Sequence, residues 1–424
     1  MADISKLNNE IDEGTDYVGY KEAFDLIKAN MPAAGVEELP LAASVGRVAA
    51  ADIIAAESYP TADVSLKDGY AIISADINHA NARHPVSLKV TGSVYAGPEF
   101  EGKVTPGSAI KICSGGRIPT GADAVVSIEF TEEAGADEIL VKADAGKGRN
   151  ILKAGGEVKA GDIIVKKGEK LLPGYLGLAA ASGIHKVAAY RRPKLAIIGV
   201  GDEVVAPGEQ LNPGQLYASN LVTMEAWLSY FGISCTASVV QDSEDEIKAE
   251  LKNCCENVDI LLTSGGAWGS ERDLVIGVLN KLGWHELFHH VRMGPGKGIA
   301  FGLWEGKPVF CLPGGPASNE MAFIQLALPG ILLASGDKQH PLQTVSATLL
   351  EDIQGRHPAW TEFKDGALER NSAGNYSVKL YKHRSRLQAI ASANSLICKP
   401  EGRLELKSGD VVEVQLLGPG LREM

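Results

Sequence analysis

Stretches of branched apolar residues alternate with helical patterns between about residues 190 and 335. An apolar run that is typical of a strand buried on both faces of a parallel sheet occurs at 258–263. The segments 194–201 and 233–240, and a segment that ends at Leu312, are also predicted to be strands. Helical patterns with cap signals follow two of these strands and begin at Ser219 and Ser243. This order of strands and helices predicts a doubly wound α/β domain over residues 190–335.

Small residues fill the connections that follow three of the predicted strands. These connections are 199–203 (GVGDE), 263–273 (TSGGAWGSERD) and 312–316 (LPGGP). Because parallel strands end at the same edge of a sheet, the three loops should meet where α/β sheets bind ligands. Adjacent glycines let a ligand approach the backbone, and free N–H groups favour an anion. One glycine loop alone is as often an ordinary connection, but three together predict a ligand site.

Short alternating strands separated by Gly and Pro turns occupy two other parts of the chain. One is 86–147, which contains VSLKVTGSV and ADAVVSIEF and is expected to form a small barrel or sandwich. The other is 340–424, where VSATLLEDI and DVVEVQLL predict a second small β domain. The expected fold class is therefore multidomain, α/β plus all-β.

Composition narrows the function classes. The formal net charge of −12 argues against a nucleic-acid-binding surface. The six cysteines form no CxxC pair, so we expect buried free thiols rather than a zinc ribbon or a redox motif. The first residues lack the pattern of a signal peptide, and no run approaches the length of a membrane span. We expect a cytoplasmic protein with no nucleic-acid or membrane partner.

Charged residues cluster around one turn in the N-terminal half. Asp63, Lys67 and Asp68 precede Gly69 within the segment 59–73. Asp-Gly is an ordinary turn signature. Two acidic residues and a lysine would also suit a metal-assisted anion site, but spacing alone favours the plain turn.

Seven segments between Tyr20 and Leu417 carry a resemblance to a known family. They are, in chain order, SLKDGYAI at 65–72, IPTGADAVV, GDEVVAPGEQLNPGQLYASN, LLTSGG, GPGKGIAFG, KPVFCLPGGP and ANSLICKPEG. Together they resemble, in the same order, the motifs of the molybdopterin molybdotransferase family, which includes bacterial MoeA and the gephyrin E domain. SLKDGYAI is similar to the DGYA-type motif of that family.

The resemblance implies an elongated subunit of four domains that forms a homodimer. The domains would be 15–58 with 148–189 (elongated, for dimerisation), 59–147 (small β), 190–335 (molybdopterin-binding α/β) and 336–424 (C-terminal, β-barrel-like). The implied enzyme hydrolyses adenylylated molybdopterin, inserts molybdate into its dithiolene and releases AMP. The implied divalent ion is Mg²⁺.

The resemblance also assigns roles to residues that match the family's motifs. The catalytic residues would be Asp68, Glu203, Asp273 and Lys297. Glu203, Asp273 and Asp68 would also bind the metal, because an ion that bridges phosphates needs hard carboxylate oxygens. Lysine and backbone N–H groups would neutralise phosphate. The substrate-binding residues would be Ser114, Gly115, Glu157, Ser264, Gly265, Gly266, Pro313, Gly314 and Pro316.

Some positions depart from the family's motifs. Gly294 stands where a lysine is expected, and Arg292 or Lys67 could replace that charge. The other departures are Lys67 for methionine, Gly315 for asparagine, Trp268 and Ser270 for small residues, and Gln388-Ala389 for a Ser-Ser pair. These changes leave two alternatives to the enzyme: a molybdopterin-binding scaffold with little or no turnover, and a paralogue that prefers tungstate.

Overall fold

The computed structural model describes residues 17–97, 101–143, 145–266, 274–383 and 385–417. Asp273, Trp268 and Ser270, which the sequence singles out, lie outside these ranges. The chain forms two compact units. The first comprises residues 1–36 and 190–424, and the second comprises residues 37–189. Each unit is described by itself.

The first unit is built around a six-stranded sheet. The strand order is β17 (Cys235–Val240), β14 (Leu195–Val200), β18 (Ile260–Ser264), β22 (Lys307–Leu312), β21 (Ala300–Trp304) and β19 (His285–His289). The first four strands are parallel, whereas β21 and β19 are antiparallel additions. All residues of β14, β18 and all but the first of β22 are buried, as the apolar run at 258–263 predicts for β18.

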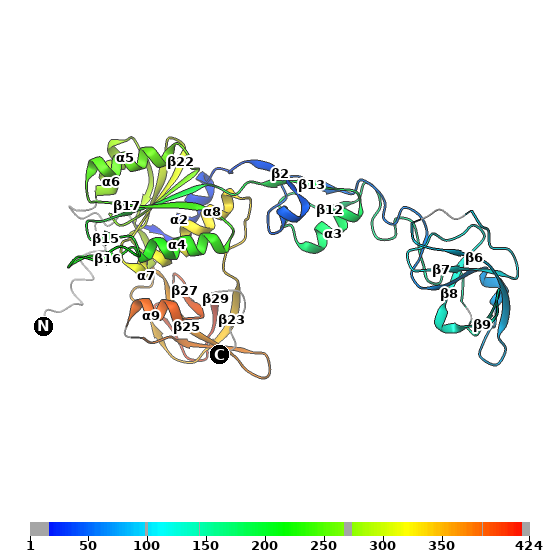
Figure 1. Ribbon diagram of the computed structural model, residues 1–424. Helices are drawn as coiled ribbons and strands as arrows, with labels where there is room; N and C mark the ends of the chain where they lie inside the picture. Colours follow the sequence, from blue (N-terminus) through cyan, green and yellow to red (C-terminus); the bar gives the residue numbers. More distant parts are fainter. Residues whose placement is uncertain (1–16, 98–100, 144, 267–273, 384, 418–424) are drawn as a thin grey trace. The chain divides into compact units, whose positions relative to one another are not determined.

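Helices cover both faces of this sheet (Figure 1). Helices α5 (Glu244–Cys255) and α6 (Leu274–Lys281) pack on one face. Helix α4 (Ser219–Tyr230) packs on the other face, together with the helical segment after β22 and with α2 (Tyr20–Asn30). The predicted doubly wound α/β architecture is confirmed. Ser243 caps α5 as expected, but α4 is capped by Ala218, so that Ser219 is its first residue and not its cap.

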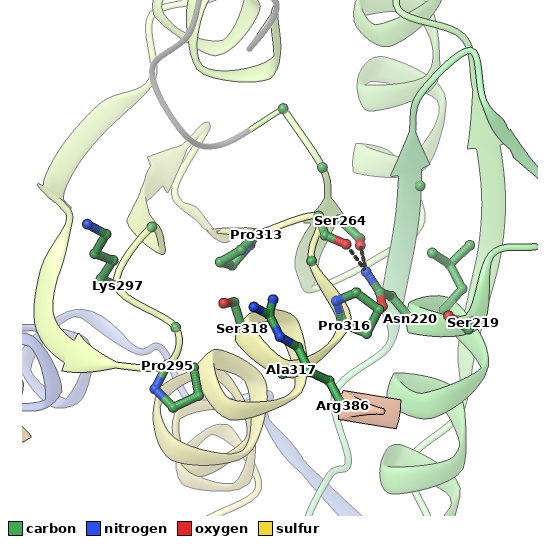
Figure 2. A pocket seen from close by; sticks show the side chains of 18 of the residues that line it. Ser219, Asn220, Ser264, Pro295, Lys297, Pro313, Pro316, Ala317, Ser318 and Arg386 are labelled. Atoms are coloured by element: carbon green, nitrogen blue, oxygen red, sulfur yellow. Dashed lines mark hydrogen bonds between the residues drawn. The ribbon is translucent and has the colours of Figure 1, made fainter. Parts of the chain in front are cut away.

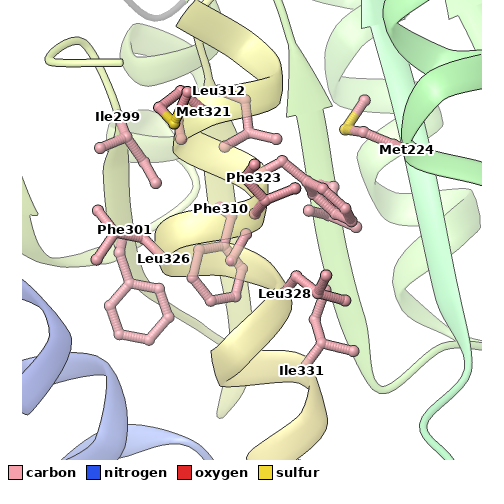
Figure 3. Packing of buried hydrophobic residues seen from close by; sticks show 14 of the residues in the cluster. Met224, Ile299, Phe301, Phe310, Leu312, Met321, Phe323, Leu326, Leu328 and Ile331 are labelled. Atoms are coloured by element: carbon pink, nitrogen blue, oxygen red, sulfur yellow. The ribbon is translucent and has the colours of Figure 1, made fainter. Parts of the chain in front are cut away.

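A hydrophobic core lies on each side of the six-stranded sheet. Figure 3 shows the larger one, which lies between the sheet and the helices on the side of α4. Its centre is aromatic, with the Phe301 and Phe310 ring centroids 4.6 Å apart. Burying each such side chain contributes about 1.5–3 kcal/mol. Ala23 and Ile27 of α2 belong to this core, although the sequence assigns residues 15–58 to the N-terminal domain. The four predicted domain boundaries remain a prediction.

A continuous helical stretch follows β22. It consists of α7 (Pro316–Ala322), the π-helical turn η4 (Phe323–Ala327) and α8 (Leu328–Ala334). Within the described ranges, this stretch is long and apolar enough for a membrane span, so the expectation that no run has that length is wrong. However, 78% of its apolar window is buried inside the protein. Its apolarity is that of a core helix.

The C-terminal part forms a closed five-stranded sheet. The strands follow the order β25 (Thr361–Arg370), β26 (Tyr376–Leu380), β23 (Thr344–Leu349), β29 (Val411–Leu416) and β27 (Ser395–Lys399), and β27 pairs again with β25. Two strands from elsewhere extend it: β20 (Val291–Gly294) pairs with β25, and β1 (Val18–Gly19) pairs with β20. The predicted barrel-like C-terminal domain is confirmed. Its remaining elements are α9 (Arg386–Ser392), β24 (Ile353–Gln354) and β28 (Glu405–Leu406).

The described part of the second unit contains three hydrophobic cores. Two of them pack against a six-stranded sheet of β8 (Ala124–Ser127), β5 (Gly69–Ile72), β7 (Ser108–Ile112), β6 (Val86–Val94), β10 (Glu138–Val141) and β9 (Thr131–Gly135). The third is made by α3 (Pro173–Ala181) and short ribbons. These ribbons pair β3 (Ile53–Ile54) with β12 (Ile163–Val165) and β2 (Val36–Pro40) with β13 (Lys186–Tyr190).

A few short elements complete the structure. Single turns of 3-10 helix are η1 (Leu41–Ser44), η2 (Ser74–Ile77) and η3 (Ile128–Phe130), and two-residue pairs are β4 (Val64–Ser65) with β11 (Ile151–Leu152) and β15 (Val204–Val205) with β16 (Leu216–Tyr217). All six cysteines are free thiols; Cys255 and Cys311 are buried, whereas the other four are partly exposed. Burial raises the pKa of Cys311 to about 12, so this thiol is inert at neutral pH.

Candidate functional site

A pocket of about 1220 Å³ lies at the carboxyl edge of the α/β sheet. Two predicted loops meet there: Ser264 to Gly266 after β18 and Pro313 to Pro316 after β22. The third loop contributes Glu203. The opposite wall comes from the loop 294–298 and from the C-terminal β domain, which adds Arg356, Trp360, residues 362–365 and Arg386. The pocket is therefore formed by two domains of one unit (Figure 2).

The hydroxyl of Ser264 is oriented by two amides. Asn220 Nδ2 donates to Ser264 Oγ at 3.1 Å (Figure 2). Asn319 Nδ2 donates to the same oxygen at 3.0 Å. A hydroxyl has two lone pairs and one proton. With both lone pairs engaged, the proton of Ser264 remains for an acceptor in the pocket. This arrangement makes Ser264 a directed hydrogen-bond donor at the end of β18.

Asn319 is a functional residue that the sequence analysis missed. It is only 1% exposed and lies in the first turn after the loop 313–316. Its Nδ2 also donates to the carbonyl of Pro313 at 2.9 Å, so one amide fixes both loops. Among the described residues, its Oδ1 has no hydrogen-bond partner. The sequence contained one indication of this residue. Asn319 lies four residues, or about one helical turn, after Gly315, the position at which the family has asparagine.

Steric constraints explain the two glycines after Ser264. Gly265 has a φ of +98° and Gly266 a φ of +67°. A Cβ on Gly265 would lie 2.5 Å from the carbonyl oxygen of Val200, and one on Gly266 would lie 2.7 Å from Val275 Cγ2. Neither position accepts a side chain without displacing its neighbours. The backbone of this loop is consequently open to a ligand.

Four basic side chains line the described part of the pocket: Lys297, Arg356, Lys364 and Arg386. Lys297 Nζ lies 5.8 Å from the centroid of the Trp360 ring, in a cation–π contact. Lys364 forms an ion pair with Glu362 at 2.9 Å. Arg292, which could have replaced the charge absent at Gly294, lies outside the pocket and donates to the Tyr17 carbonyl.

The buried side chain of Lys399 stabilises the segment of the pocket wall that contains Arg356 and Trp360. Lys399 is 0% exposed, and its Nζ donates to the carbonyls of His357 (3.1 Å), Trp360 (2.7 Å) and Arg403 (2.8 Å). It also lies 3.5 Å from Glu362, which accepts from the Arg356 N–H at 2.7 Å. Three carbonyls and one carboxylate thus satisfy the ammonium, which is the condition for burying a charge.

Acidic side chains occupy the other side of the pocket. Glu203, which is exposed, and Asp242 line it near the end of β14. Within the described ranges, no three carboxylate, histidine or cysteine side chains gather as a metal site. Asp273 cannot be placed because it lies outside these ranges. Near the Arg386 wall, burial raises the pKa of Asp365, and Lys364 only partly offsets this effect.

The site residues predicted in the second unit form a group of their own. Asp68 Oδ1 accepts a hydrogen bond from the Ser114 N–H at 2.7 Å, and Gly115 follows with a φ of +79°. Asp63 instead pairs with Lys153 at 2.7 Å, and Glu157 is exposed. The turn at 63–69 therefore brings Asp68 to the loop 113–116 and directs Asp63 elsewhere. The roles predicted for these residues stay predictions.

Two family models match the chain. The MoeA N-terminal region (domain I and II) matches residues 18–183, and a probable molybdopterin binding domain matches residues 196–332. Among curated relatives, molybdopterin molybdenumtransferase 2 of Mycobacterium tuberculosis is 30% identical over 387 residues, which cover 89% of this chain and 94% of that protein. Molybdopterin molybdenumtransferase of Staphylococcus aureus is 30% identical over 403 residues, covering 93% and 94%.

Solved structures agree with the sequence relatives. Two crystal structures of the MoeA protein from Pyrococcus horikoshii superpose with TM-scores of 0.78 and 0.77 and sequence identities of 32% and 29%. Both cover 95% of this chain, and this chain covers 99% and 100% of them. The similarity therefore extends over nearly the whole length of both chains.

Replacing Asn319 by Leu should lower the free energy of unfolding by about 1–3 kcal/mol, because the Pro313 carbonyl and one lone pair of Ser264 would lose their buried donor. Asn220→Leu is the matched comparison. Asn220 donates to Ser264 and to Gly314, but it is partly exposed, so water can replace its amide and the loss should be smaller. Urea denaturation of both variants measures the difference. Equal losses would show that burial does not decide the role of Asn319.

Replacing Glu362 by Gln should have an effect that depends on pH. Burial alone would raise the pKa of Glu362, but the Arg356 N–H and the charges of Lys364 and Lys399 outweigh it and hold the pKa below that of an ordinary glutamate. Such a carboxylate stabilises the fold above its unfolded pKa and loses this effect as the pH falls through its folded pKa. The free energy of unfolding should therefore exceed that of Glu362→Gln by a constant amount above about pH 5 and converge with it in acid.

Denaturant titrations over a pH series test this expectation. Glu369→Gln is the control, since Glu369 lies on the same strand, is exposed and pairs with Lys379 across the surface. Exposed pairs contribute little, so this variant should stay close to the wild type throughout. A difference for Glu362→Gln that does not change with pH would contradict a role for its charge.

Proposed function

We propose that this chain, which belongs to the MoeA family of molybdopterin molybdenumtransferases, is a metal-inserting transferase of molybdenum cofactor biosynthesis. Its substrates would be adenylylated molybdopterin and molybdate, and AMP would be released. Family membership rests on 30% identity over 89% of the chain. The observation that carries the proposal further is the pocket at the carboxyl edge of the sheet, which combines a directed hydroxyl, open glycine backbone and cationic side chains.

The pocket suits a polyanionic substrate. Gly265, Gly266 and Gly314 give phosphate oxygens access to the backbone. The Ser264 hydroxyl is positioned to donate to one such oxygen, and Lys297 supplies positive charge. Cleavage of a phosphoanhydride depends mainly on positioning and charge neutralisation. These residues can supply both without a protein nucleophile, so direct attack by water or by an oxyanion is the reaction that they support best.

Mg²⁺ is part of the proposal. When bound, it would supply positive charge that neutralises the phosphate groups of the substrate. Mg²⁺ usually takes one or two protein carboxylates and completes its shell with water and phosphate. Glu203 and Asp242, which both line the pocket, fit this requirement. Asp273 and Asp68 remain predicted ligands and catalytic residues.

A turnover assay tests the function. The purified chain, given adenylylated molybdopterin, Mg²⁺ and molybdate, should release AMP. Lys297→Met should lower the catalytic efficiency by about 10- to 100-fold, because one charge-assisted phosphate contact is lost. Lys281→Met is the matched control, since Lys281 pairs with Glu244 at 2.6 Å on the surface of the same domain and does not line the pocket.

Several outcomes separate the candidate functions. AMP above background supports the transferase. A wild-type protein that binds the adenylated substrate without releasing AMP would leave the scaffold, which the family comparison does not favour. Tungstate that outperforms molybdate in the same assay would indicate the tungstate-preferring paralogue.

A homodimer and a cytoplasmic location complete the proposal. The six free thiols suit a reducing compartment. In the second unit, Ile54 and Ile163 are cross-strand neighbours that are 51% and 50% exposed. Apolar pairs exposed on a sheet suit a protein interface.

Light scattering of the full chain should therefore give twice the chain mass of 44.7 kDa. The double variant Ile54→Lys, Ile163→Lys should shift the protein towards monomer, because two buried charges would face each other across a two-fold interface. Val222→Lys, at an equally exposed apolar position in the first unit (49%), is the control and should remain dimeric. A monomeric wild-type protein would refute the homodimer.

A further inference from the structure

Arg386 connects the C-terminal β domain to the α/β pocket. It is the first residue of α9, and α9 packs against α7, the helix that follows the loop 313–316. Figure 2 shows its side chain reaching into the pocket beside Ser318, near Pro316 and Ala317. Arg386, Ser318 and Ala317 all line the pocket. Arg386 therefore belongs to the C-terminal domain but places its side chain in the pocket that the loop 313–316 lines.

Among the residues that the structure describes, none neutralises the charge of Arg386. Within the described ranges, its guanidinium forms no ion pair with a carboxylate and no hydrogen bond. Asp365 lies in the same wall without pairing with it. By contrast, Lys364 is paired with Glu362, and Lys297 lies against Trp360. Arg386 is therefore a pocket cation whose five donors are available to a ligand.

We infer that Arg386 binds a tetrahedral oxyanion of the substrate, and so makes the C-terminal β domain part of the substrate site. A guanidinium offers two parallel N–H groups that match two oxygens of a phosphate or a molybdate. The hydroxyl of Ser318 beside it is a further donor. Because Gly294 carries no charge and Arg292 donates to the Tyr17 carbonyl outside the pocket, Arg386 supplies a positive charge in addition to that of Lys297.

The identity of the bound anion in this inference rests on the proposed function. Two probe anions distinguish whether Arg386 binds the metal oxyanion or a phosphate group of the substrate. Isothermal calorimetry of the full chain would be performed with molybdate alone and with inorganic phosphate alone. Arg386→Ala should raise the Kd of at least one anion by about 10- to 100-fold. Arg386→Lys keeps the charge but loses the paired N–H geometry, so its Kd should lie between those of the wild type and the alanine variant.

The control is Arg370→Ala. Arg370 lies on β25 of the same domain, stacks on Tyr376 and is outside the pocket, so its removal should not change either Kd. Because Arg386 is exposed and has no hydrogen-bond or ion-pair partner in the part of the chain that the structure describes, the melting temperature of Arg386→Ala should match that of the wild type. A larger Kd for molybdate assigns Arg386 to the metal oxyanion, and a larger Kd for phosphate assigns it to the pterin phosphate or the adenylate.

Two results would overturn the inference: a wild-type protein that binds neither anion, and an Arg386→Ala variant that binds both like the wild type. The failure of the proposed function is distinguishable from these. If anion binding depends on Arg386 but the wild type releases no AMP, the transferase proposal fails and the anion site stands. If the wild type releases AMP and Arg386→Ala binds both anions and turns over unchanged, the transferase stands and the inference fails.

Discussion

The pairing of β20 with β25 is the constraint on which the pocket depends. β20 belongs by sequence to the α/β domain, whereas β25 belongs to the C-terminal β domain. They pair in parallel, with Met293 opposite Thr361 and Gly294 opposite Glu362. β20 leads directly into the loop that carries Lys297, and β25 begins directly after Trp360. Backbone hydrogen bonds of one short ladder therefore set the distance between two walls that belong to different domains.

A buried ion pair between Lys399 and Glu362 lies next to this ladder, and its surroundings explain why the protein tolerates it. Lys399 and Glu362 are both almost fully buried, and removing two ions from water costs several kcal/mol each. Here each remaining donor of Lys399 finds a carbonyl of the loop 357–360 or of Arg403. An apolar residue could fill this space with less desolvation, but it could not hold three carbonyls in a fixed arrangement. The pair is therefore better understood as fixing the wall that presents Arg356 and Trp360 than as a source of stability.

The parts of the structure that repeat a local pattern could be predicted from the sequence, and the parts that depend on contacts between domains could not. The strands β14, β18 and β22 were predictable because burial on both faces leaves a mainly apolar run. The meeting of Ser264 and Pro313 followed from the shared edge of parallel strands. By contrast, Asn319 acts through two bonds to other loops, and Arg386 enters the pocket because α9 packs on α7. Neither relation leaves a periodic trace in the sequence.

The packing around Gly294 shows whether steric crowding requires a glycine at this position, where the family has lysine. A missing lysine could have been imposed by crowding, but a Cβ at Gly294 would lie 3.8 Å from Glu362 and 3.9 Å from Trp360, which is ordinary van der Waals contact. Packing therefore permits a side chain at this position, and its absence is not a steric necessity. The basic residues that do line the pocket are distributed differently. Lys297 comes from the α/β domain, whereas Arg356, Lys364 and Arg386 come from the C-terminal β domain. The α/β domain alone would present an open edge with one of these four charges, so the electrostatic character of the site belongs to the pair of domains.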